Sequence, residues 1–274
     1  MTDVNYFGEI QQFREARDER LKTNPQTWLA LIGLFRLDEG DNFFGADDNN
    51  KIVLAKCGQR QCGSFSLKNG SITLIPNPET QIKVNDLPPE PRNLRTDQDE
   101  DTDLIRVGSL TMMILLRGKD HYLRIWDRES PGITDFKGLK YYSINSEYRI
   151  AATFLPYVPL KVIKIQDVIG TEYDGHLVGE ARFNLNGTDC RLVAEKSGDE
   201  LLFSFTDETR KDTTYPGGRY LMAKMPEDGQ VTLDFNRAVN WPCAYTAFAT
   251  CPLPPAENQL PIRIEAGEMR FQEH

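Results

Sequence analysis

Two-residue turn signals separate short apolar segments along most of this chain. They stand at Asn69-Gly70, Asn186-Gly187, Ser197-Gly198 and Asp228-Gly229. Such pairs favour tight hairpins, because asparagine, aspartate and glycine adopt positive φ at little cost. The sequence therefore predicts a mainly β protein that is built from antiparallel hairpins.

The segments between these turns have the length and composition of β-strands. In the first half we expect strands at residues 51–55, 64–67, 71–75, 81–84, 104–107, 110–117 and 121–126. In the second half we expect them at residues 148–154, 160–166, 176–185, 190–195, 200–206, 219–224, 231–235 and 260–266. Regularly spaced short strands are typical of sandwiches and barrels. We expect a β-sandwich-like half over residues 28–135, and a larger antiparallel β barrel or sandwich over residues 136–274.

The N-terminal segment follows a helical pattern instead. Phe7, Ile10, Phe13 and Leu21 approximate one apolar stripe among charged residues. Asn24-Pro25 ends the pattern, because the residue before proline is pushed out of the α region. We expect residues 1–27 to form a helix that covers the β core.

Composition narrows the classes of partner. The chain has 274 residues and a formal net charge of −9. This balance disfavours nucleic acids and anionic membranes, since both reward clusters of Lys and Arg. No segment has the apolar core of a signal peptide or the length of a transmembrane helix. We expect a soluble cytoplasmic protein with a small-molecule ligand as its partner; the sequence does not indicate its oligomeric state.

The sequence predicts neither a metal nor a cofactor. It contains no Walker loop, dinucleotide fingerprint, Gly-x-Ser-x-Gly elbow or His-Glu-x-x-His motif. The odd number of cysteines favours reduced thiols. We interpret Cys57 and Cys62 as neighbours in a hairpin. Cys243 and Cys251 leave several roles open, namely nucleophile, disulfide or inert packing. Two thiols alone do not complete a tetrahedral zinc site.

The densest run of turn-forming and polar residues lies at residues 213–268. If residues 231–236 form a strand, Asp234 and Asn236 share one face of it. Arg219, on the preceding predicted strand, would then approach one of them across a hairpin. An Arg–Asp pair either orients a substrate carboxylate or phosphate, or stabilises irregular backbone. Both interpretations stay open at this point.

This run also carries a family resemblance. The stretches TYPGGRYL, DFNRAVNWPCAY and CPLPPAENQLPIRIEAGE resemble the hallmark block of DUF1684, an uncharacterised family of bacterial and archaeal proteins. RIWDRESPG, GLKYYSIN and LIGLFRLDEGDNFFGADD resemble its other segments, so the likeness covers most of the chain. The residues that carry the block here are Tyr215, Gly218, Arg219, Tyr220, Asp234, Phe235, Asn236, Asn240, Cys243, Cys251, Pro252, Asn258 and Glu268. The resemblance implies a site without naming its chemistry.

One departure from the family pattern lies inside the block. Where relatives commonly have Asn-Pro-Pro-Cys, this chain has Asn240-Trp241-Pro242-Cys243. We expect Trp241 to narrow a pocket or to pack against it.

A weaker likeness concerns the first half. Residues 40–84 and the following Asn85-Asp86 resemble a forkhead-associated β-sandwich, which implies binding of phosphothreonine peptides. Such domains have an Arg after the glycine and a Ser-x-x-His loop. Here Ala46 follows Gly45, and no histidine precedes His121. We therefore expect that peptide binding is lost.

Together these observations predict a protein that binds a small polar or anionic metabolite through its C-terminal half, with turnover as an extension. We assign ligand contacts to Arg219, Tyr220, Tyr215, Asn236, Asn240 and Arg124. We assign acid, base or nucleophile roles to Asp234, Glu268 and Cys243. The alternative is a non-catalytic interaction or scaffold module whose C-terminal polar block is structural.

Overall fold

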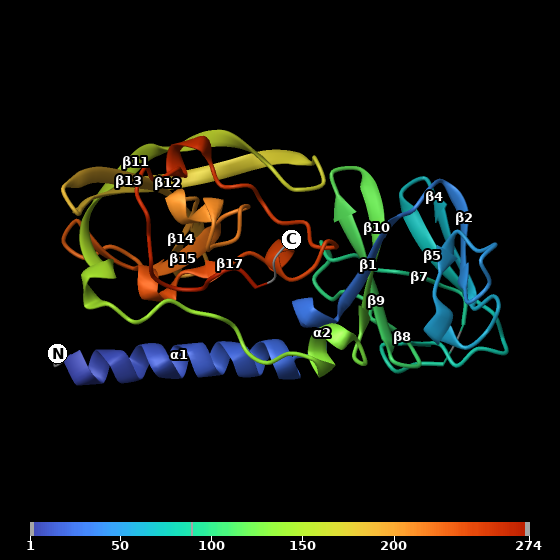
Figure 1. Ribbon diagram of the computed structural model, residues 1–274. Helices are drawn as coiled ribbons and strands as arrows, with labels where there is room; N and C mark the ends of the chain where they lie inside the picture. Colours follow the sequence, from blue (N-terminus) through green and yellow to red (C-terminus); the bar gives the residue numbers. More distant parts are fainter. Residues whose placement is uncertain (1–2, 89, 272–274) are drawn as a thin grey trace. The chain divides into compact units, whose positions relative to one another are not determined.

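The computed structural model describes residues 3–88 and 90–271, which divide into two compact units (Figure 1). The large unit comprises residues 1–20 and 137–274, and the small unit comprises residues 21–136. The strands form antiparallel sheets with one parallel pair, and one long helix stands at the N-terminus. The predicted mainly β class is therefore confirmed.

Two five-stranded sheets make up the small unit. One has the order β1 (Leu31–Arg36), β10 (Asp120–Asp127), β9 (Leu110–Arg117), β8 (Ile105–Val107), β6 (Lys83–Val84). The other has the order β3 (Ile52–Val53), β2 (Gly40–Gly45), β4 (Gly63–Lys68), β5 (Ser71–Pro76), β7 (Arg92–Asn93). Both sheets contribute to one apolar cluster, as in a sandwich. The short helices of this unit are η1 (Trp28–Ala30), η2 (Ala55–Cys57) and α2 (Pro131–Thr134).

A disulfide joins Cys57 to Cys62 in the small unit. The prediction of reduced thiols is wrong for this pair, because the loop after η2 brings the two side chains together. Cys190, Cys243 and Cys251 are free thiols. Since disulfides persist mainly in oxidising compartments, the cysteine count no longer supports a cytoplasmic location.

One seven-stranded antiparallel sheet forms the large unit. Its order is β16 (Gln230–Asp234), β11 (Arg149–Gln166), β12 (Glu172–Leu185), β13 (Thr188–Ser197), β14 (Glu200–Phe205), β15 (Arg219–Lys224), β17 (Val239–Asn240). The predicted turn at Asn186-Gly187 is confirmed, with φ values of 53° and 80°. The short helices here are η3 (Ser146–Tyr148), η4 (Glu208–Lys211), η5 (Phe235–Arg237), η6 (Pro242–Ala244) and η7 (Ala256–Asn258).

The sheet of the large unit is strongly curved, since its two edge strands are near neighbours in sequence. From Asp234 to Val239 the chain can reach at most about 18 Å. A flat sheet of seven strands would separate its edges by about 29 Å. No ladder closes the sheet among the described residues, so a barrel is not confirmed.

Two predictions about strand pairing are wrong. Asp228-Gly229 makes a tight turn, but the flanking β15 and β16 do not form a hairpin, because β16 pairs with β11 instead. Residues 260–266 are not a strand, although Leu260, Ile264 and Ala266 are buried. The line along which β15 and β16 face each other without a ladder is called the seam.

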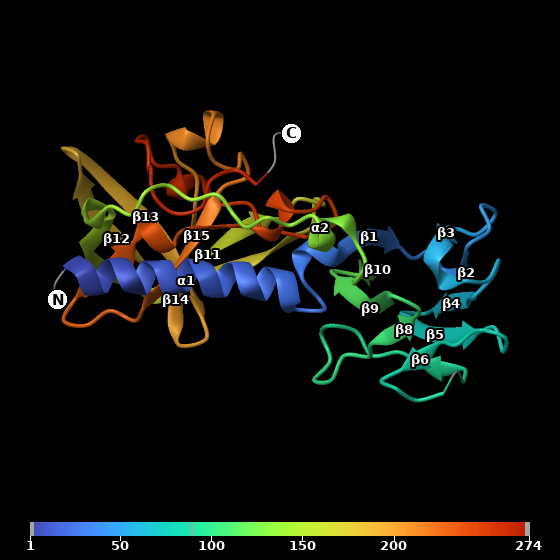
Figure 2. The ribbon, with the colours of Figure 1, turned by 60° about the horizontal axis from the view of Figure 1, so that its bottom comes forward.

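Helix α1 (Asp3–Thr23) lies along the large unit in both Figure 1 and Figure 2. The predicted cover helix exists, but its buried stripe differs from the predicted one. Ile10 and Leu21 of the predicted stripe are buried, but Phe7 is 41% exposed and Tyr6, which was not predicted, is buried. None of the helices within the described ranges has both the length and the apolar character that a membrane crossing requires.

Candidate functional site

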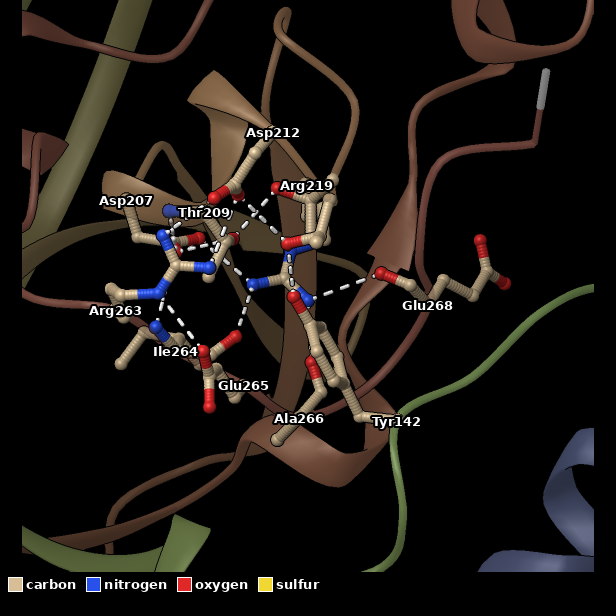
Figure 3. Close-up of polar contacts among 12 residues, drawn as sticks. Tyr142, Asp207, Thr209, Asp212, Arg219, Arg263, Ile264, Glu265, Ala266 and Glu268 are labelled. Carbon is tan, nitrogen blue, oxygen red and sulfur yellow. Dashed lines mark hydrogen bonds and ion pairs between the residues drawn. The ribbon is translucent and has the colours of Figure 1, made fainter. Parts of the chain in front are cut away.

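Arg219 is surrounded by groups of the chain itself. Its side chain lies on the inward face of β15 and is 1% exposed. Nη2 lies 2.8 Å from Asp207 Oδ2 and donates to the Ile264 carbonyl at 2.9 Å. Nη1 donates to the carbonyls of Ala266 and Glu268 (Figure 3). The guanidinium therefore satisfies carbonyl groups that no neighbouring strand binds. These five residues are called the Arg219 cluster.

The anion that Arg219 binds is Asp207. Its Oδ1 accepts hydrogen bonds from the backbone N–H groups of Thr209 at 2.9 Å and Ile264 at 3.1 Å. The prediction that Arg219 approaches Asp234 or Asn236 is wrong. Strand β15 pairs with β14, which places Arg219 opposite Phe205 and so close to Asp207. Sequence reasoning missed Asp207 because it lies outside the hallmark block.

Glu268 and Asn240 form a second buried network. Glu268 Oε2 accepts from the backbone N–H of Asn240 and from the hydroxyl of Tyr245, both at 2.7 Å, while Oε1 pairs with Arg17 of α1. The Asn240 amide donates to the carbonyl of Met269 at 2.8 Å. Burial raises the pKa of Tyr245, so its hydroxyl stays a donor. Desolvation opposes the charge on Arg17, but the Glu268 carboxylate outweighs it and raises the pKa. These contacts attach α1 to the C-terminal segment.

Asp234 and Asn236 lie together, but not as neighbours on one strand face: β16 ends at Asp234, which caps η5, and Asn236 belongs to η5. Tyr6 of α1 joins them. Asp234 Oδ1 accepts from the Tyr6 hydroxyl at 2.8 Å and from the Asn236 backbone N–H at 3.2 Å. The Asn236 amide donates to the Asn145 carbonyl at 2.8 Å and accepts from the Asn145 N–H at 3.0 Å. Burial, and then the bond to Asp234, raises the pKa of Tyr6. Asn236 is thus fully engaged, whereas the Asp234 side chain keeps 12% exposure.

A cleft of about 770 Å³ opens beside Asp234 along the seam. Residues of α1, β11, β15 and β16 line it, and we call it the seam cleft. Its lining carries both signs of charge, from Glu9, Arg149, Glu200, Lys224, Glu227, Asp228, Asp234 and Arg237. A smaller hollow of about 320 Å³ shares Glu200, Met222 and Arg237 with it and includes Tyr220.

The two arginines of the seam cleft rest on aromatic rings. The Arg149 guanidinium lies 5.0 Å from the centre of the Tyr6 ring, and that of Arg237 lies 5.1 Å from the centre of the Phe13 ring. Arg237 Nε is also 3.5 Å from Asp234 Oδ2. Cation–π contacts orient a guanidinium without occupying its N–H groups. Both side chains can therefore donate to an anion in the cleft.

The other predicted site residues lie elsewhere. Tyr220 packs on Trp241, with ring centres 4.5 Å apart, so Trp241 does pack beside a hollow. Tyr215 contacts the Cys243 thiol. Arg124 belongs to β10 of the small unit and lies near the rings of Trp28 and Trp126. No group of three or more His, Cys, Asp and Glu side chains is arranged to hold a metal ion in the part of the chain that the structure describes.

Sequence reasoning missed most of the cleft-lining residues. Tyr6 and Phe13 are one helical heptad apart, a spacing that could have identified the inward face of α1. Arg149 and Lys224 gave no signal, because single charges on strands are common and the pairing of β11 with β16 was not predicted. Arg237 was visible only as a neighbour of Asn236.

Comparisons with known proteins identify a family and a similar solved structure. The family described as "Protein of unknown function (DUF1684)" matches residues 134–269. One similar solved structure is the solution NMR structure of an uncharacterised protein of Haloarcula marismortui. It is 30% identical, the match covers 53% of this chain and 85% of that chain, and the TM-score is 0.44. None of the curated proteins matches this chain.

Proposed function

The chain belongs to the DUF1684 family, whose description names no activity, and we propose that its large unit binds a small zwitterionic metabolite in the seam cleft. The supporting observation is a cavity of about 770 Å³ whose lining combines carboxylates with two arginines held on aromatic rings. Small-molecule sites commonly have volumes of roughly 300–1,000 Å³ and a few convergent polar groups.

The charges of the cleft suggest the chemical class of the ligand. Arg149 and Arg237 suit a carboxylate or phosphate. Asp234 and Glu200 suit an ammonium group, since ionised carboxylates only accept hydrogen bonds. The lining holds five carboxylates and three cations, so a purely anionic ligand would meet net repulsion. Within the polar or anionic class predicted from sequence, a molecule that carries both signs fits better than a purely anionic one.

The buried networks do not take part in this proposal. Arg219 and Glu268 are 1% and 0% exposed at their side chains, and both Nη atoms of Arg219 and both carboxylate oxygens of Glu268 bind groups of the chain. Asp234 is the one predicted acid–base residue that also lines the seam cleft. Its Oδ1 accepts from Tyr6, while Oδ2 faces Arg237. Of the acid–base residues predicted from sequence, Asp234 is thus the one that could exchange a proton with a ligand in the cleft.

Thermal shift with matched probes tests the proposal. Phosphoethanolamine carries both signs, whereas ethanolamine and inorganic phosphate each carry one. We expect only the zwitterion to stabilise the wild type. At a hundred times its dissociation constant, a ligand adds about 2.7 kcal/mol, which corresponds to a midpoint shift of roughly 5–10 °C. Arg149→Gln and Arg237→Gln should each reduce the shift.

Arg263→Gln is the matched control, because Arg263 pairs with Asp212 on the surface and does not line the cleft. Its shift with phosphoethanolamine should equal that of the wild type. Equal shifts in all four proteins, or a larger response to inorganic phosphate than to the zwitterion, would contradict the proposal.

A non-catalytic interaction module is the second candidate, and the exposed part of β11 favours it. Beyond Thr153 the outer edge of β11 has no strand partner among the described residues. Val158, Leu160 and Val162 on this stretch are 91%, 51% and 55% exposed. Exposed edges with apolar side chains tend to pair with other chains. Sedimentation of the wild type and of Val158→Lys would reveal self-association through this edge.

A further inference from the structure

Three chemically reactive side chains meet outside the seam cleft. Cys243 lies in η6, Cys251 follows in the Pro-rich segment, and Tyr215 precedes β15. The side chains of Cys251 and Tyr215 lie close enough to the Cys243 thiol to shift its pKa. Cys251 Sγ also accepts the backbone N–H of Cys243 at 3.1 Å. The thiol of one cysteine is therefore held against the backbone of the other.

This geometry is compatible with a disulfide. The N–Cα bond is about 1.46 Å long, so Cys251 Sγ lies at most about 4.6 Å from the Cα of Cys243. Disulfides need a Cα–Cα separation of roughly 4.4–6.8 Å, so the two residues must lie side by side, as the contact of Cys251 Sγ with the Cys243 backbone places them. Cys243 is partly exposed and Cys251 is 4% exposed. A reagent from solution can thus reach Cys243 first.

We propose that Cys243 and Cys251 form a second site, which reduces hydroperoxides and becomes a disulfide. The Cys243 thiolate attacks the terminal oxygen of the hydroperoxide, the O–O bond breaks, and the alcohol leaves with a proton. Cys243 is then a sulfenic acid. The thiol of Cys251 attacks its sulfur, an S–S bond forms, and water departs. Two thiols lose two electrons, and one hydroperoxide gains them.

The surroundings of Cys243 support the nucleophilic role. Hydrogen bonding from Cys251, and then from Tyr215, lowers the pKa of Cys243 to about 7, although burial opposes this. Burial, and then the bond to Cys243, raises the pKa of Tyr215, so its hydroxyl stays a donor to the sulfur. Cys190 differs, because burial raises its pKa. It is therefore the natural internal control.

The lowered pKa of Cys243 sets how much faster it should react with peroxide than an unperturbed thiol does. At pH 7 a thiol of pKa about 8.5 is roughly 3% ionised, whereas a thiol of pKa about 7 is about half ionised. A thiolate of lower pKa is also a weaker nucleophile, and this difference reduces the rate constant of the thiolate by about fivefold. We therefore expect Cys243 to react with hydrogen peroxide roughly threefold faster than an unperturbed thiol, and faster still than Cys190.

The test is peroxide oxidation of the reduced full-length protein, followed by alkylation and peptide mass mapping. One equivalent of hydrogen peroxide at pH 7 should protect Cys243 and Cys251 from alkylation together and leave Cys190 alkylated. Cys251→Ser should stop at the sulfenic acid, which dimedone captures on Cys243. Cys243→Ser should leave Cys251 reduced over the same time. Cys190→Ser should behave like the wild type.

Tyr215→Phe separates a chemical role from a structural one. We expect the pH midpoint of Cys243 oxidation to move upward, while the thermal midpoint of the folded variant is measured in parallel. The proposal is overturned if Cys243 reacts no faster than Cys190. It is equally overturned if Cys251 stays free while Cys243 is oxidised beyond the sulfenic acid.

Discussion

The Arg219 cluster and the seam cleft are made of the same residue types, but they differ in access. In the cluster, the charged nitrogens of Arg219 bind Asp207 and three carbonyls, and its side chain is 1% exposed. In the cleft, Arg149 and Arg237 rest on rings and line a cavity. A buried pair satisfied within the chain stabilises irregular backbone, whereas oriented charges beside a cavity can bind a ligand. Access, rather than composition, distinguishes the two regions.

The largest expected effect comes from Arg219→Ala. Removing one partner of a buried ion pair leaves an uncompensated charge, here on Asp207, and costs about 3–5 kcal/mol. We expect this loss in the free energy of unfolding, measured by urea denaturation. Phosphoethanolamine affinity of the folded fraction should be unchanged.

Arg263→Ala is the control for this prediction, because the Arg263–Asp212 pair is on the surface. We expect it to change stability little. If Arg219→Ala destabilised no more than Arg263→Ala but abolished ligand binding, the roles assigned to the cluster and the cleft would have to be exchanged.

The next largest effect concerns Asp234→Asn. A hydrogen bond to a charged group contributes about 1.5–3 kcal/mol, so affinity for the zwitterion should fall by roughly 10- to 150-fold. Titration calorimetry would measure this change. Asp212→Asn is the matched control, and its affinity should equal that of the wild type. An Asp234→Asn protein that binds as tightly as the wild type would remove Asp234 from the site.

The turns and the strand faces could be predicted from sequence, since both follow from local rules. Asn186-Gly187 adopts the expected positive φ values, and along β16 Val231 and Leu233 are buried while Thr232 between them is exposed. Segment 260–266 was predicted as a strand; Leu260, Ile264 and Ala266 are buried, but burial does not imply pairing. Its carbonyls at Ile264 and Ala266 bind Arg219 instead of a strand.

Strand order and access could not be predicted, because both depend on contacts between distant segments. Arg149 faces the cleft only because β11 pairs with β16, with Arg149 opposite Asp234. Tyr6 reaches Asp234 across 228 positions of sequence. Without these pairings, the sequence could not show that Arg219 contacts Asp207 instead of Asp234 or Asn236.

Alkaline pH is expected to lower the stability of the protein through Tyr6, which lines the seam cleft. The pKa of Tyr6 is raised in the folded state, so the unfolded chain loses this proton first as the pH rises. The contribution of Tyr6 to the free energy of unfolding is complete below about pH 10, which is the pKa of Tyr in the unfolded chain. Above that pH the contribution declines by at most about 1.4 kcal/mol per pH unit. We expect Tyr6→Phe to flatten this decline in urea denaturation between pH 9 and 11. An unchanged slope would show that Tyr6 ionises as easily in the folded protein.

The smallest expected effect tests where the seam cleft ends. Trp241 packs on Tyr220, which lines the smaller hollow but not the cleft beside Asp234. Loss of an aromatic pair costs about 0.5–1.5 kcal/mol beyond the area it buries, so Trp241→Leu should lower stability modestly. Affinity for phosphoethanolamine should be unchanged if the ligand occupies the cleft alone. A clear loss of affinity, with Trp241→Phe restoring it, would mean that the ligand extends past Arg237 into the smaller hollow. The departure of this chain from the family's Asn-Pro-Pro-Cys pattern would then act on ligand choice rather than on packing.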